Sequence, residues 1–269
     1  MKPYYETENG RLFYGDCLDI LPELEQVDLT ITSPPYGGIR DYHGYNFNFE
    51  TIAKELFRTT KDTGAVVWVV KDEMINGSES GESFRQALYF KEIGFKLVTM
   101  LYTKNGGLRT GSTLFYQNNF EYVFILTKTN QHTFNPIKDR ININAGQIDK
   151  SSTKRKKDGS LKPYSCVIKG KGYRDNVWKY NTGGSVSSTD KIAYNHPAIF
   201  PEALVQDHIL SWSNEGDIVI DPMCGSGTTL KMAERLGRKW IGIETSLEYC
   251  AIAKQRIERE LQQRKLPGF

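Results

Sequence analysis

A glycine-containing loop between a short apolar run and a predicted helix has the pattern of a nucleotide-type site. The run Ile218-Val219-Ile220 is typical of a strand, and the loop that follows it is Asp221-Pro222-Met223-Cys224-Gly225-Ser226-Gly227-Thr228-Thr229. A Gly-x-Gly turn there lets the backbone approach a ligand at a helix N-terminus, and an acid ending the next strand can hold a ribose. Glu244, 17 residues past Gly227, fits that role. The combination of turn, helix, strand and acidic residue favours a ligand-binding role for these glycines over a role in the turn alone.

The same loop lacks the residues that bind phosphates in the common motifs. A dinucleotide fingerprint needs a third small residue where this chain has Leu230, and a P-loop needs Gly-Lys-Ser/Thr where it has Gly-Thr-Thr. A ligand with a ribose and no phosphates fits better, and S-adenosylmethionine is the obvious one. Because only 42 residues follow Gly227, most strands of the sheet must precede the loop. We therefore expect a circularly permuted strand order.

A second loop with chemical potential follows another predicted strand. Ser33-Pro34-Pro35-Tyr36 comes directly after Leu29 to Thr32. The prolines favour extended backbone and leave carbonyls without neighbouring N–H groups, so the loop is a rigid array of acceptors. At the carboxyl edge of a parallel sheet, the Ser33 hydroxyl and the Pro34 carbonyl could both accept from an exocyclic NH2. Tyr36 could stack on the base and face the charge that develops during methyl transfer. In isolation, the same residues would also suit a simple tight turn.

The elements that must position these loops alternate between strands and helices. Such alternation predicts an α/β fold with a mostly parallel sheet and helices on both faces. Strands are expected at residues 12–14, 27–32, 65–70, 96–102, 121–127, 217–221 and 239–244. Helices are expected at residues 17–24, 49–60, 83–93, 201–212, 228–236 and 247–261.

Positive charge is concentrated in the middle of the chain, in a basic segment at residues 128–192. This segment holds 14 Lys and Arg, five Asp and no Glu, whereas the rest of the chain holds 21 basic and 27 acidic residues. The net charge of +3 conceals this division. Clustered Lys and Arg gain affinity for nucleic acid by releasing its counterions, although a solvated insertion would have the same composition. Tyr164, Tyr173, Trp178 and Tyr180 lie among the basic residues and could stack or simply pack.

Composition excludes several classes of protein. The 269 residues are 39% hydrophobic and 25% charged, which is typical of a soluble globular protein. The longest apolar run, Ala65 to Val70, is far shorter than a membrane span, and the first residues do not resemble a secretory signal. Four separated cysteines suggest neither a zinc site nor a disulfide framework. We expect a cytoplasmic protein with reduced thiols, no metal and no membrane partner.

The chain resembles a known family, the DNA amino-methyltransferases that modify N4 of cytosine or N6 of adenine. Ser33-Pro34-Pro35-Tyr36 looks like the catalytic tetrapeptide of the family, and Asp221 to Thr229 looks like its cofactor loop. The catalytic motif precedes the variable region and the cofactor loop, which is the order of the β class. The resemblance implies a Rossmann-like S-adenosylmethionine-dependent methyltransferase fold with a seven-stranded sheet, and a bacterial, archaeal or phage source.

The resemblance also assigns domains and residue roles. Residues 1–127 and 193–269 would form the catalytic domain, and residues 128–192 would be the target-recognition insertion. His196-Pro197-Ala198-Ile199-Phe200-Pro201 looks like the motif that closes over the methyl donor, and Gly15-Asp16-Cys17 looks like the adenine-recognition segment. His196 and Asp16 would also serve as ordinary helix caps. The predicted cofactor residues are Asp16, Cys17, His196, Phe200, Asp221, Pro222, Cys224, Gly225, Gly227, Thr228 and Glu244. The predicted DNA contacts are Lys154, Arg155, Lys156, Lys157, Lys169, Lys171 and Arg174.

Several alternative activities remain open. Cytosine C5 methylation needs a cysteine nucleophile that normally follows proline, and this chain has no Pro-Cys pair. A direct attack by the amine needs no Cys-His or Ser-His pair. Other candidates are an inactive DNA-binding module on the same fold and an RNA or small-molecule methyltransferase, which the basic segment disfavours.

The resemblance also bears on the target base and on the partners of the protein. Ser at the first position of the tetrapeptide is paired more often with cytosine N4 in the resembling family, and Asp with adenine N6. We therefore expect cytosine N4 in a base flipped out of double-stranded DNA, with adenine N6 as the alternative. The resemblance also admits a cognate restriction endonuclease and a homodimer.

Overall fold

The chain divides into two units in the computed structural model, which describes residues 1–35, 47–105, 116, 118–150, 152–184 and 186–264. Unit 1 is formed by Met1–Asn135 and Val177–Phe269, and unit 2 by Pro136–Asn176. Unit 2 spans fewer residues than the basic segment, which covers residues 128–192. Residues on both sides of it belong to unit 1, where some of them form a strand of the central sheet.

Unit 1 is built on one mixed sheet that has nine strands among the described residues. Their spatial order is β1 (Tyr5–Glu6), β2 (Gly10–Tyr14), β17 (Lys239–Glu244), β16 (Ile218–Asp221), β3 (Val27–Thr32), β4 (Thr60–Val70), β8 (Phe120–Thr127), β7 (Lys96–Asn105) and β15 (Val177–Asn181). The strands from β2 to β4 are parallel, and β8 runs antiparallel to both of its neighbours. The C-terminal strands β17 and β16 therefore lie side by side between the N-terminal strands β2 and β3, and the expected permuted order is confirmed.

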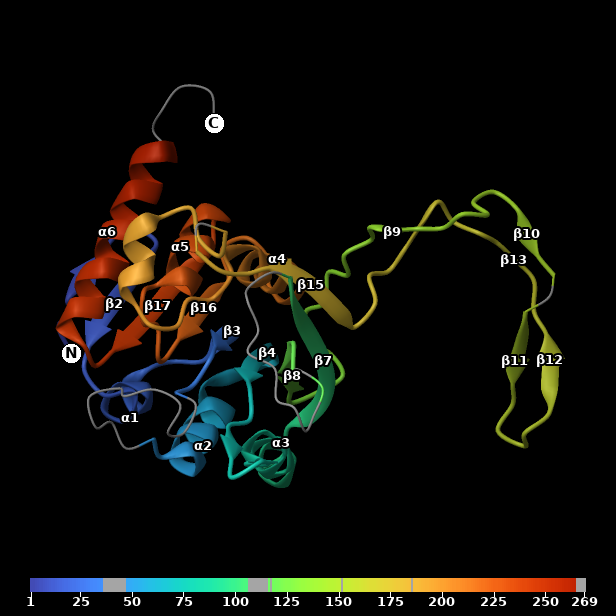
Figure 1. Cartoon of the computed structure of the whole chain (residues 1–269), viewed down its shortest axis with the longest axis horizontal. Helices are drawn as coiled ribbons and strands as arrows, with labels where there is room; N and C mark the ends of the chain where they lie inside the picture. The colour runs from blue at the N-terminus through green and yellow to red at the C-terminus, as the bar shows by residue number, and fades with distance from the viewer. Residues whose placement is uncertain (36–46, 106–115, 117, 151, 185, 265–269) are drawn as a thin grey trace. The chain divides into compact units, whose positions relative to one another are not determined.

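Helices cover both faces of this sheet (Figure 1). On one face lie α1 (Cys17–Ile20), the 3-10 turn η1 (Leu21–Glu23), α2 (Phe49–Thr59) and α3 (Glu82–Glu92). On the other face lie the 3-10 turn η3 (Lys191–Asn195), α4 (Glu202–Trp212), α5 (Thr228–Arg235) and α6 (Leu247–Arg264). Residues 65–70 of β4 are all buried, as expected for a strand covered on both faces. Trp68 packs against Phe49 and Phe90 in the core beneath α2 and α3. None of the helices in the described ranges is long and apolar enough to cross a membrane.

The structure differs from the sequence expectations in two details. The sheet has nine strands in the described residues, where seven were expected, because β1 adds a short antiparallel edge and β15 pairs in parallel with β7. β15 comes from the basic segment, whose polar composition concealed it. The helix expected at residues 17–24 breaks into α1 and η1. Pro22 lies at this break and has no N–H for an α-helical hydrogen bond.

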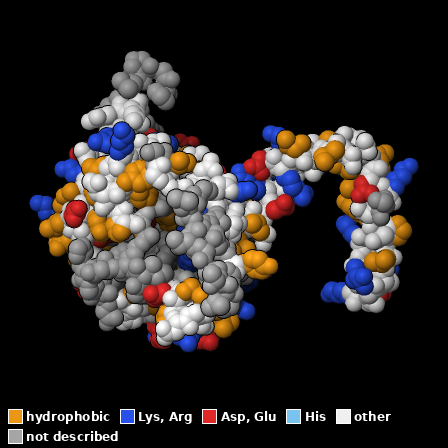
Figure 2. Space-filling model, viewed as in Figure 1, with side chains coloured by type: hydrophobic (Ala, Val, Ile, Leu, Met, Phe, Trp, Pro, Cys, Tyr) orange, Lys and Arg blue, Asp and Glu red, His pale blue; other side chains and the backbone are white. Residues whose placement is uncertain are grey.

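Unit 2 consists of short antiparallel ladders. β9 (Arg140–Ile141) pairs with β14 (Lys171–Gly172), β10 (Ile148–Asp149) with β13 (Cys166–Val167), and β11 (Thr153–Arg155) with β12 (Leu161–Pro163). The turn between β11 and β12 is closed by Lys156 N, which donates to the Ser160 carbonyl (2.8 Å). Gly159 supplies a left-handed residue to this turn (φ +84°). Every residue of β11 and β12 is exposed, and basic side chains gather over them in Figure 2.

Candidate active site

A cavity of about 180 Å³ lies in unit 1 at the edge of the sheet where the parallel strands end. Ligands bind at this edge in open α/β sheets. The loops after β3, β16 and β17 border the cavity, as do the end of β7 and the start of β8. The described residues that line it are Cys17, Ser33, Pro34, Pro35, Tyr102, Lys104, Glu121, His196, Ala198, Ile199, Phe200, Asp221, Pro222, Met223, Cys224, Gly225, Ser226, Thr228, Glu244, Thr245 and Tyr249.

The loop after β16 is held against the end of β17. Cys224 N donates to the Ile243 carbonyl (2.9 Å), and Gly225 N donates to Oε2 of Glu244 (2.8 Å). Gly225 has φ +49°, and a Cβ on it would lie 2.7 Å from Nε2 of His196. Glycine is therefore required, because the loop and the segment that carries His196 meet at this point.

Glu244 presents a nearly buried carboxylate to the cavity. Its Oε1 accepts from Ser246 N (2.8 Å), while Oε2 accepts from Gly225 N. Burial raises the pKa of Glu244, and these backbone hydrogen bonds oppose the shift. Each carboxylate oxygen can accept a further hydrogen bond, so the group suits a hydroxyl donor such as a ribose.

Asp221 supplies a second buried carboxylate at the end of β16. Thr229 Oγ1 donates to Oδ2 (2.8 Å), and Met223 N donates to Oδ1 (3.2 Å). Burial raises the pKa of Asp221 to about 6 against these hydrogen bonds. Above that pH, the ionised Asp221 carboxylate gives this part of the cavity a negative character.

The segment from His196 to Phe200 forms another wall. The His196 ring contacts the Tyr249 ring with centroids 4.3 Å apart, and its Nδ1 lies 2.6 Å from the Ala198 carbonyl oxygen, to which the Nδ1–H tautomer donates. Both His196 and Phe200, which the sequence assigned to the cofactor, line the cavity.

The proline loop reaches the same cavity from β3. Ser33, Pro34 and Pro35 line it together with Asp221 and Glu244. The two loops that the sequence singled out are therefore neighbours in space, although they lie nearly 190 residues apart. The predicted stacking residue Tyr36 lies outside the residues that the structure describes.

Two of the predicted cofactor residues are absent from the lining. Asp16 caps α1, with its Oδ1 accepting from Leu18 N (2.9 Å). Gly227 caps α5 in the left-handed region (φ +75°), and a Cβ on it would lie 2.6 Å from the Cβ of Ala253. Gly227 therefore allows α5 and α6 to pack closely. The other predicted cofactor residues in the described part of the chain line the cavity: Cys17, His196, Phe200, Asp221, Pro222, Cys224, Gly225, Thr228 and Glu244.

Sequence reasoning missed a polar group on the β7–β8 side of the cavity. Tyr102 and Lys104 on β7 and Glu121 on β8 line it. They follow no motif, and only the antiparallel pairing of β7 with β8 brings them to this edge. A charged residue at the start of a strand that is otherwise apolar was the available signal for Glu121.

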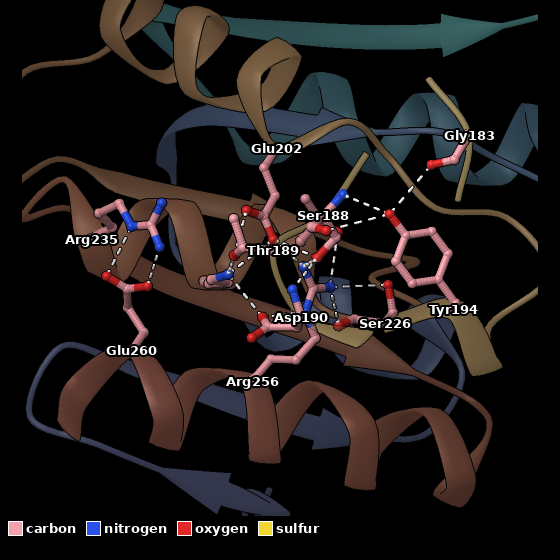
Figure 3. Close-up of polar contacts among 12 residues, drawn as sticks. Gly183, Ser188, Thr189, Asp190, Tyr194, Glu202, Ser226, Arg235, Arg256 and Glu260 are labelled. Carbon is pink, nitrogen blue, oxygen red and sulfur yellow. Dashed lines mark hydrogen bonds and ion pairs between the residues drawn. The ribbon is translucent and has the colours of Figure 1, made fainter. Parts of the chain in front are cut away.

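Behind the cofactor loop lies a buried network of four charges (Figure 3). Lys231 Nζ contacts Oδ2 of Asp190 (2.8 Å) and Oε1 of Glu202 (2.9 Å). Arg256 contacts the same two carboxylates, through Nε (3.2 Å) and Nη2 (2.9 Å). Arg256 is fully buried and Lys231 is 2% exposed. In the sequence, the signal for this network was a cation on the apolar face of α5 and another on the apolar face of α6. Arg256, for example, lies between Ala253 and Ile257 on the buried side of α6.

The network also holds the cofactor loop directly. Arg256 Nη1 donates to the Ser226 carbonyl (2.7 Å) and to Thr228 Oγ1 (2.9 Å). Burial would raise the pKa of Glu202, but hydrogen bonds from Ser188 and Lys231, with the positive charges of Lys231 and Arg256, lower it to about 2. Glu202 is therefore ionised at neutral pH.

A permuted α/β sheet with a carboxylate at the end of β17 and a glycine loop after β16 defines the class of methyltransferases that use S-adenosylmethionine. Comparisons with known proteins give the family. The family model N6_N4_Mtase, described as DNA methylase, matches residues 27–255. The chain belongs to this family of N6/N4 DNA methylases and is an S-adenosylmethionine-dependent DNA methyltransferase.

Individual relatives span nearly the whole chain. The orphan methyltransferase M.BamHII of Bacillus amyloliquefaciens is 50% identical over 248 residues, which are 91% of this chain and 90% of that protein. The structure of PvuII DNA methyltransferase, a cytosine-N4-specific enzyme, matches with a TM-score of 0.70 at 21% identity, over 97% of this chain and 93% of that one. A Thermus thermophilus protein solved in complex with S-adenosyl-L-methionine matches with a TM-score of 0.63 at 23% identity, over 97% of this chain and 96% of that one. At these identities the two solved structures share the fold.

Removal of the Arg256 charge should destabilise the protein. An R256M variant leaves the carboxylates of Asp190 and Glu202 short of one cation, and breaking a buried ion pair costs about 3–5 kcal/mol. We expect the free energy of unfolding, measured with urea, to fall by that amount. The matched control R259M changes an exposed arginine of the same helix and should leave stability within about 0.5 kcal/mol of wild type. Equal stability of R256M and R259M would show that the network contributes nothing to folding.

The raised pKa of Asp221 predicts a pH-dependent stability. The folded protein binds this proton up to about pH 6, whereas the unfolded chain releases it near pH 3.8. Stability from this group is present below pH 3.8 and is lost as the pH rises to about 6. The stability of wild type relative to D221N should therefore fall by about 3 kcal/mol across that window and stay level above it. Chemical unfolding of both proteins at several pH values measures this, and a difference that rises with pH would contradict the assignment.

Proposed function

We propose that this chain transfers a methyl group to the exocyclic amine of a base flipped out of double-stranded DNA, with N4 of cytosine as the favoured target. The observation that carries the proposal is the shared cavity. Ser33 and Pro34, which can hold an amine, line the same space as Asp221, Gly225 and Glu244, which can hold the methyl donor.

The residues present fit S-adenosylmethionine. The Glu244 carboxylate suits the ribose hydroxyls, and the negative charge of Asp221 complements a cationic ligand. The position of Gly225, where a Cβ would collide with His196, lets backbone approach the ligand closely. When bound, the cofactor supplies an electrophilic methyl group on a sulfonium centre. The predicted contacts of Asp16 and Gly227 are not part of this proposal, because neither residue lines the cavity.

The proline loop supplies the residues that act on the base. Ser33 Oγ and the Pro34 carbonyl oxygen would accept the two amine hydrogens and hold them out of the ring plane. The amine lone pair is then localised on nitrogen and becomes a better nucleophile. Pro34 and Pro35 have no N–H groups, so the loop offers acceptors in a rigid conformation. Tyr36 would stack on the base, as its place in the tetrapeptide suggests.

Two cysteines near the cavity, Cys224 and Cys250, are poorly suited to covalent catalysis. Burial raises the pKa of Cys224 well above its usual value, and the neighbouring carboxylates of Glu244 and Asp221 add to the shift. Burial likewise raises the pKa of Cys250 to about 12. A thiol must ionise to act as a nucleophile, so these two thiols favour direct attack by an amine over cytosine C5 chemistry.

Serine at the first position of the tetrapeptide supports cytosine as the target. This rests on the resemblance to the family, in which Ser is paired more often with cytosine N4 and Asp with adenine N6. Adenine N6 is the alternative target, since either acceptor can hold an NH2 group.

Unit 2 has the composition and form of a DNA-binding element. Residues 136–176 contain 11 Lys and Arg against four Asp. A two-stranded antiparallel ribbon fits the major groove of DNA, and β11 and β12 form an exposed ribbon. The predicted contacts Lys154, Arg155, Lys156 and Lys157 lie on β11 and its turn. Lys169 and Lys171 are exposed, with Lys171 on β14, and Arg174 is paired with Asp139 (Nε to Oδ2, 2.9 Å).

Methyl transfer to DNA tests the proposed reaction. Wild-type protein, labelled S-adenosylmethionine and duplex DNA should yield labelled N4-methylcytosine after digestion to nucleosides. S33A removes one of the two amine acceptors and should abolish detectable transfer while cofactor affinity stays within about twofold. The control S78A changes an exposed serine outside the cavity and should match wild type.

Other products of the same experiment would identify the alternatives. N6-methyladenine would replace cytosine as the target within the same family. Labelled 5-methylcytosine would contradict the amine mechanism. DNA binding without transfer would favour an inactive DNA-binding module, and transfer by S33A at the wild-type rate would remove Ser33 from the mechanism.

Neutralising the β11 turn should weaken DNA binding mainly through electrostatics. For K154Q/K156Q/K157Q we expect the slope of log affinity against log salt to become shallower by about 0.9 for each phosphate that is no longer neutralised. The matched control K54Q/K91Q/K239Q removes three exposed lysines from unit 1 and should keep the wild-type slope. Equal slopes for both triple variants would refute the role of unit 2. Titrations of fluorescent duplex DNA at several salt concentrations measure the slopes.

A further inference from the structure

A buried polar cluster lines the cavity beside the proline loop and has no part in the mechanism described above. Tyr102 and Glu121 face each other across the antiparallel pair β7–β8, and the Tyr102 hydroxyl donates to Oε2 of Glu121 (2.7 Å). Lys104 forms an ion pair with Oε1 of the same carboxylate. Tyr102 is 3% exposed and Glu121 is 6% exposed. A nearly buried carboxylate thus holds a lysine at the wall of the cavity.

The sheet topology explains why this cluster lies near Ser33. β8 runs antiparallel to β4, so it begins at the edge where β3 and β4 end. β7 runs antiparallel to β8 and ends at that edge. Glu121 at the start of β8 and Lys104 near the end of β7 therefore share the edge with the loop that follows β3.

The charges around the cavity are unequal. Among the described residues that line it, Lys104 is the single Lys or Arg, whereas Glu121, Asp221 and Glu244 are acidic. The Lys104 side chain is 32% exposed, whereas the side chain of its partner Glu121 is 7% exposed. An ammonium has three donors and can serve a carboxylate and a ligand together. The carboxylate is the fixed part of the pair, and the lysine is the part that reaches the cavity.

The target base presents a second nucleophile that the site must control. Cytosine N3 lies beside the N4 amine and keeps a lone pair in the ring plane, while the amine lone pair is delocalised into the ring. Adenine N1 stands in the same relation to its N6 amine. A donor aimed at this ring nitrogen would occupy its lone pair and fix the rotation of the base, so that the amine faces the methyl group.

We infer that Lys104 donates a hydrogen bond to the ring nitrogen next to the target amine and thereby determines which nitrogen is methylated. Glu121 is a positioning residue that holds Lys104, and Tyr102 holds Glu121. This inference rests on the proposed methylation of an exocyclic amine, and it applies to either target base.

The test uses the full chain and a DNA duplex that carries its own recognition sequence, read from plasmid DNA modified in cells that express the protein. K104M and K104Q should each reduce kcat/KM for the duplex by about 10- to 100-fold, since a hydrogen bond from a charged donor is removed. S-adenosylmethionine affinity should match wild type, whereas the melting temperature should fall because the Glu121 carboxylate loses its ion pair. Rates are therefore compared at a temperature at which circular dichroism shows that each variant is folded. K96M removes an exposed lysine at the opposite end of β7 and should keep full activity.

A modified base isolates the contact itself. In a second duplex, 3-deazacytosine replaces the target cytosine, or 1-deazaadenine replaces adenine if N6-methyladenine is the product. Wild type should lose rate on this duplex by about the same factor as K104M loses on the normal duplex. K104M should show little further loss, because the two changes remove one interaction. E121Q and Y102F should reduce kcat/KM in the same direction by smaller factors.

Four results would overturn the inference. The first is an equal penalty from the modified base in wild type and K104M, and the second is K104M activity equal to that of K96M. The third is a loss of S-adenosylmethionine affinity in K104M that accounts for its whole defect. The fourth is the absence of methyl transfer by wild type, in which case the proposed function fails as well. In the first three cases wild type still methylates DNA, so the proposed function would stand.

Discussion

The buried ion network of Lys231, Arg256, Asp190 and Glu202 ties the cofactor loop to the rest of the catalytic unit. Its two cations come from α5 and α6, and its two carboxylates come from Asp190, just before η3, and from Glu202, the first residue of α4. Arg256 also binds the Ser226 carbonyl, so a loop that must approach a ligand closely rests on a fully buried guanidinium. Four charges away from water are stable only when each is matched, and the low pKa of Glu202 reflects that matching.

The central sheet brings the loops that form the candidate active site to one edge. The loops after β3, β16 and β17 emerge at one edge, and β7 and β8 add the Lys104–Glu121 pair to the same edge. The C-terminal strand β16 pairs in parallel with the N-terminal strand β3, so the glycine loop and the proline loop that follow these strands become neighbours. The pKa of Asp221 is raised because the turn that this carboxylate supports encloses it and buries it away from water.

Local patterns predicted much of this structure. The apolar runs gave strands such as β3 and β17 with their observed bounds, and the loops at Ser33 and Gly225 were placed at one cavity from their motifs. β15 was missed because its burial depends on pairing with β7, and Lys104 and Glu121 were missed because only a long-range strand pairing unites them. Asp16 and Gly227 are outside the residues that line the cavity and cap α1 and α5, respectively. Because an N-cap and a ligand-binding turn have the same local sequence signal, their assignment to the cofactor stays a prediction.

A crystal structure of the protein with bound S-adenosylmethionine tests the central claim most directly, which is that donor and base share the cavity between the proline loop and the glycine loop. The account predicts that the ribose hydroxyls contact the Glu244 carboxylate and that the sulfonium methyl faces Ser33 and the Pro34 carbonyl. A cofactor bound outside this cavity, or one whose methyl group faces away from Ser33, would contradict it.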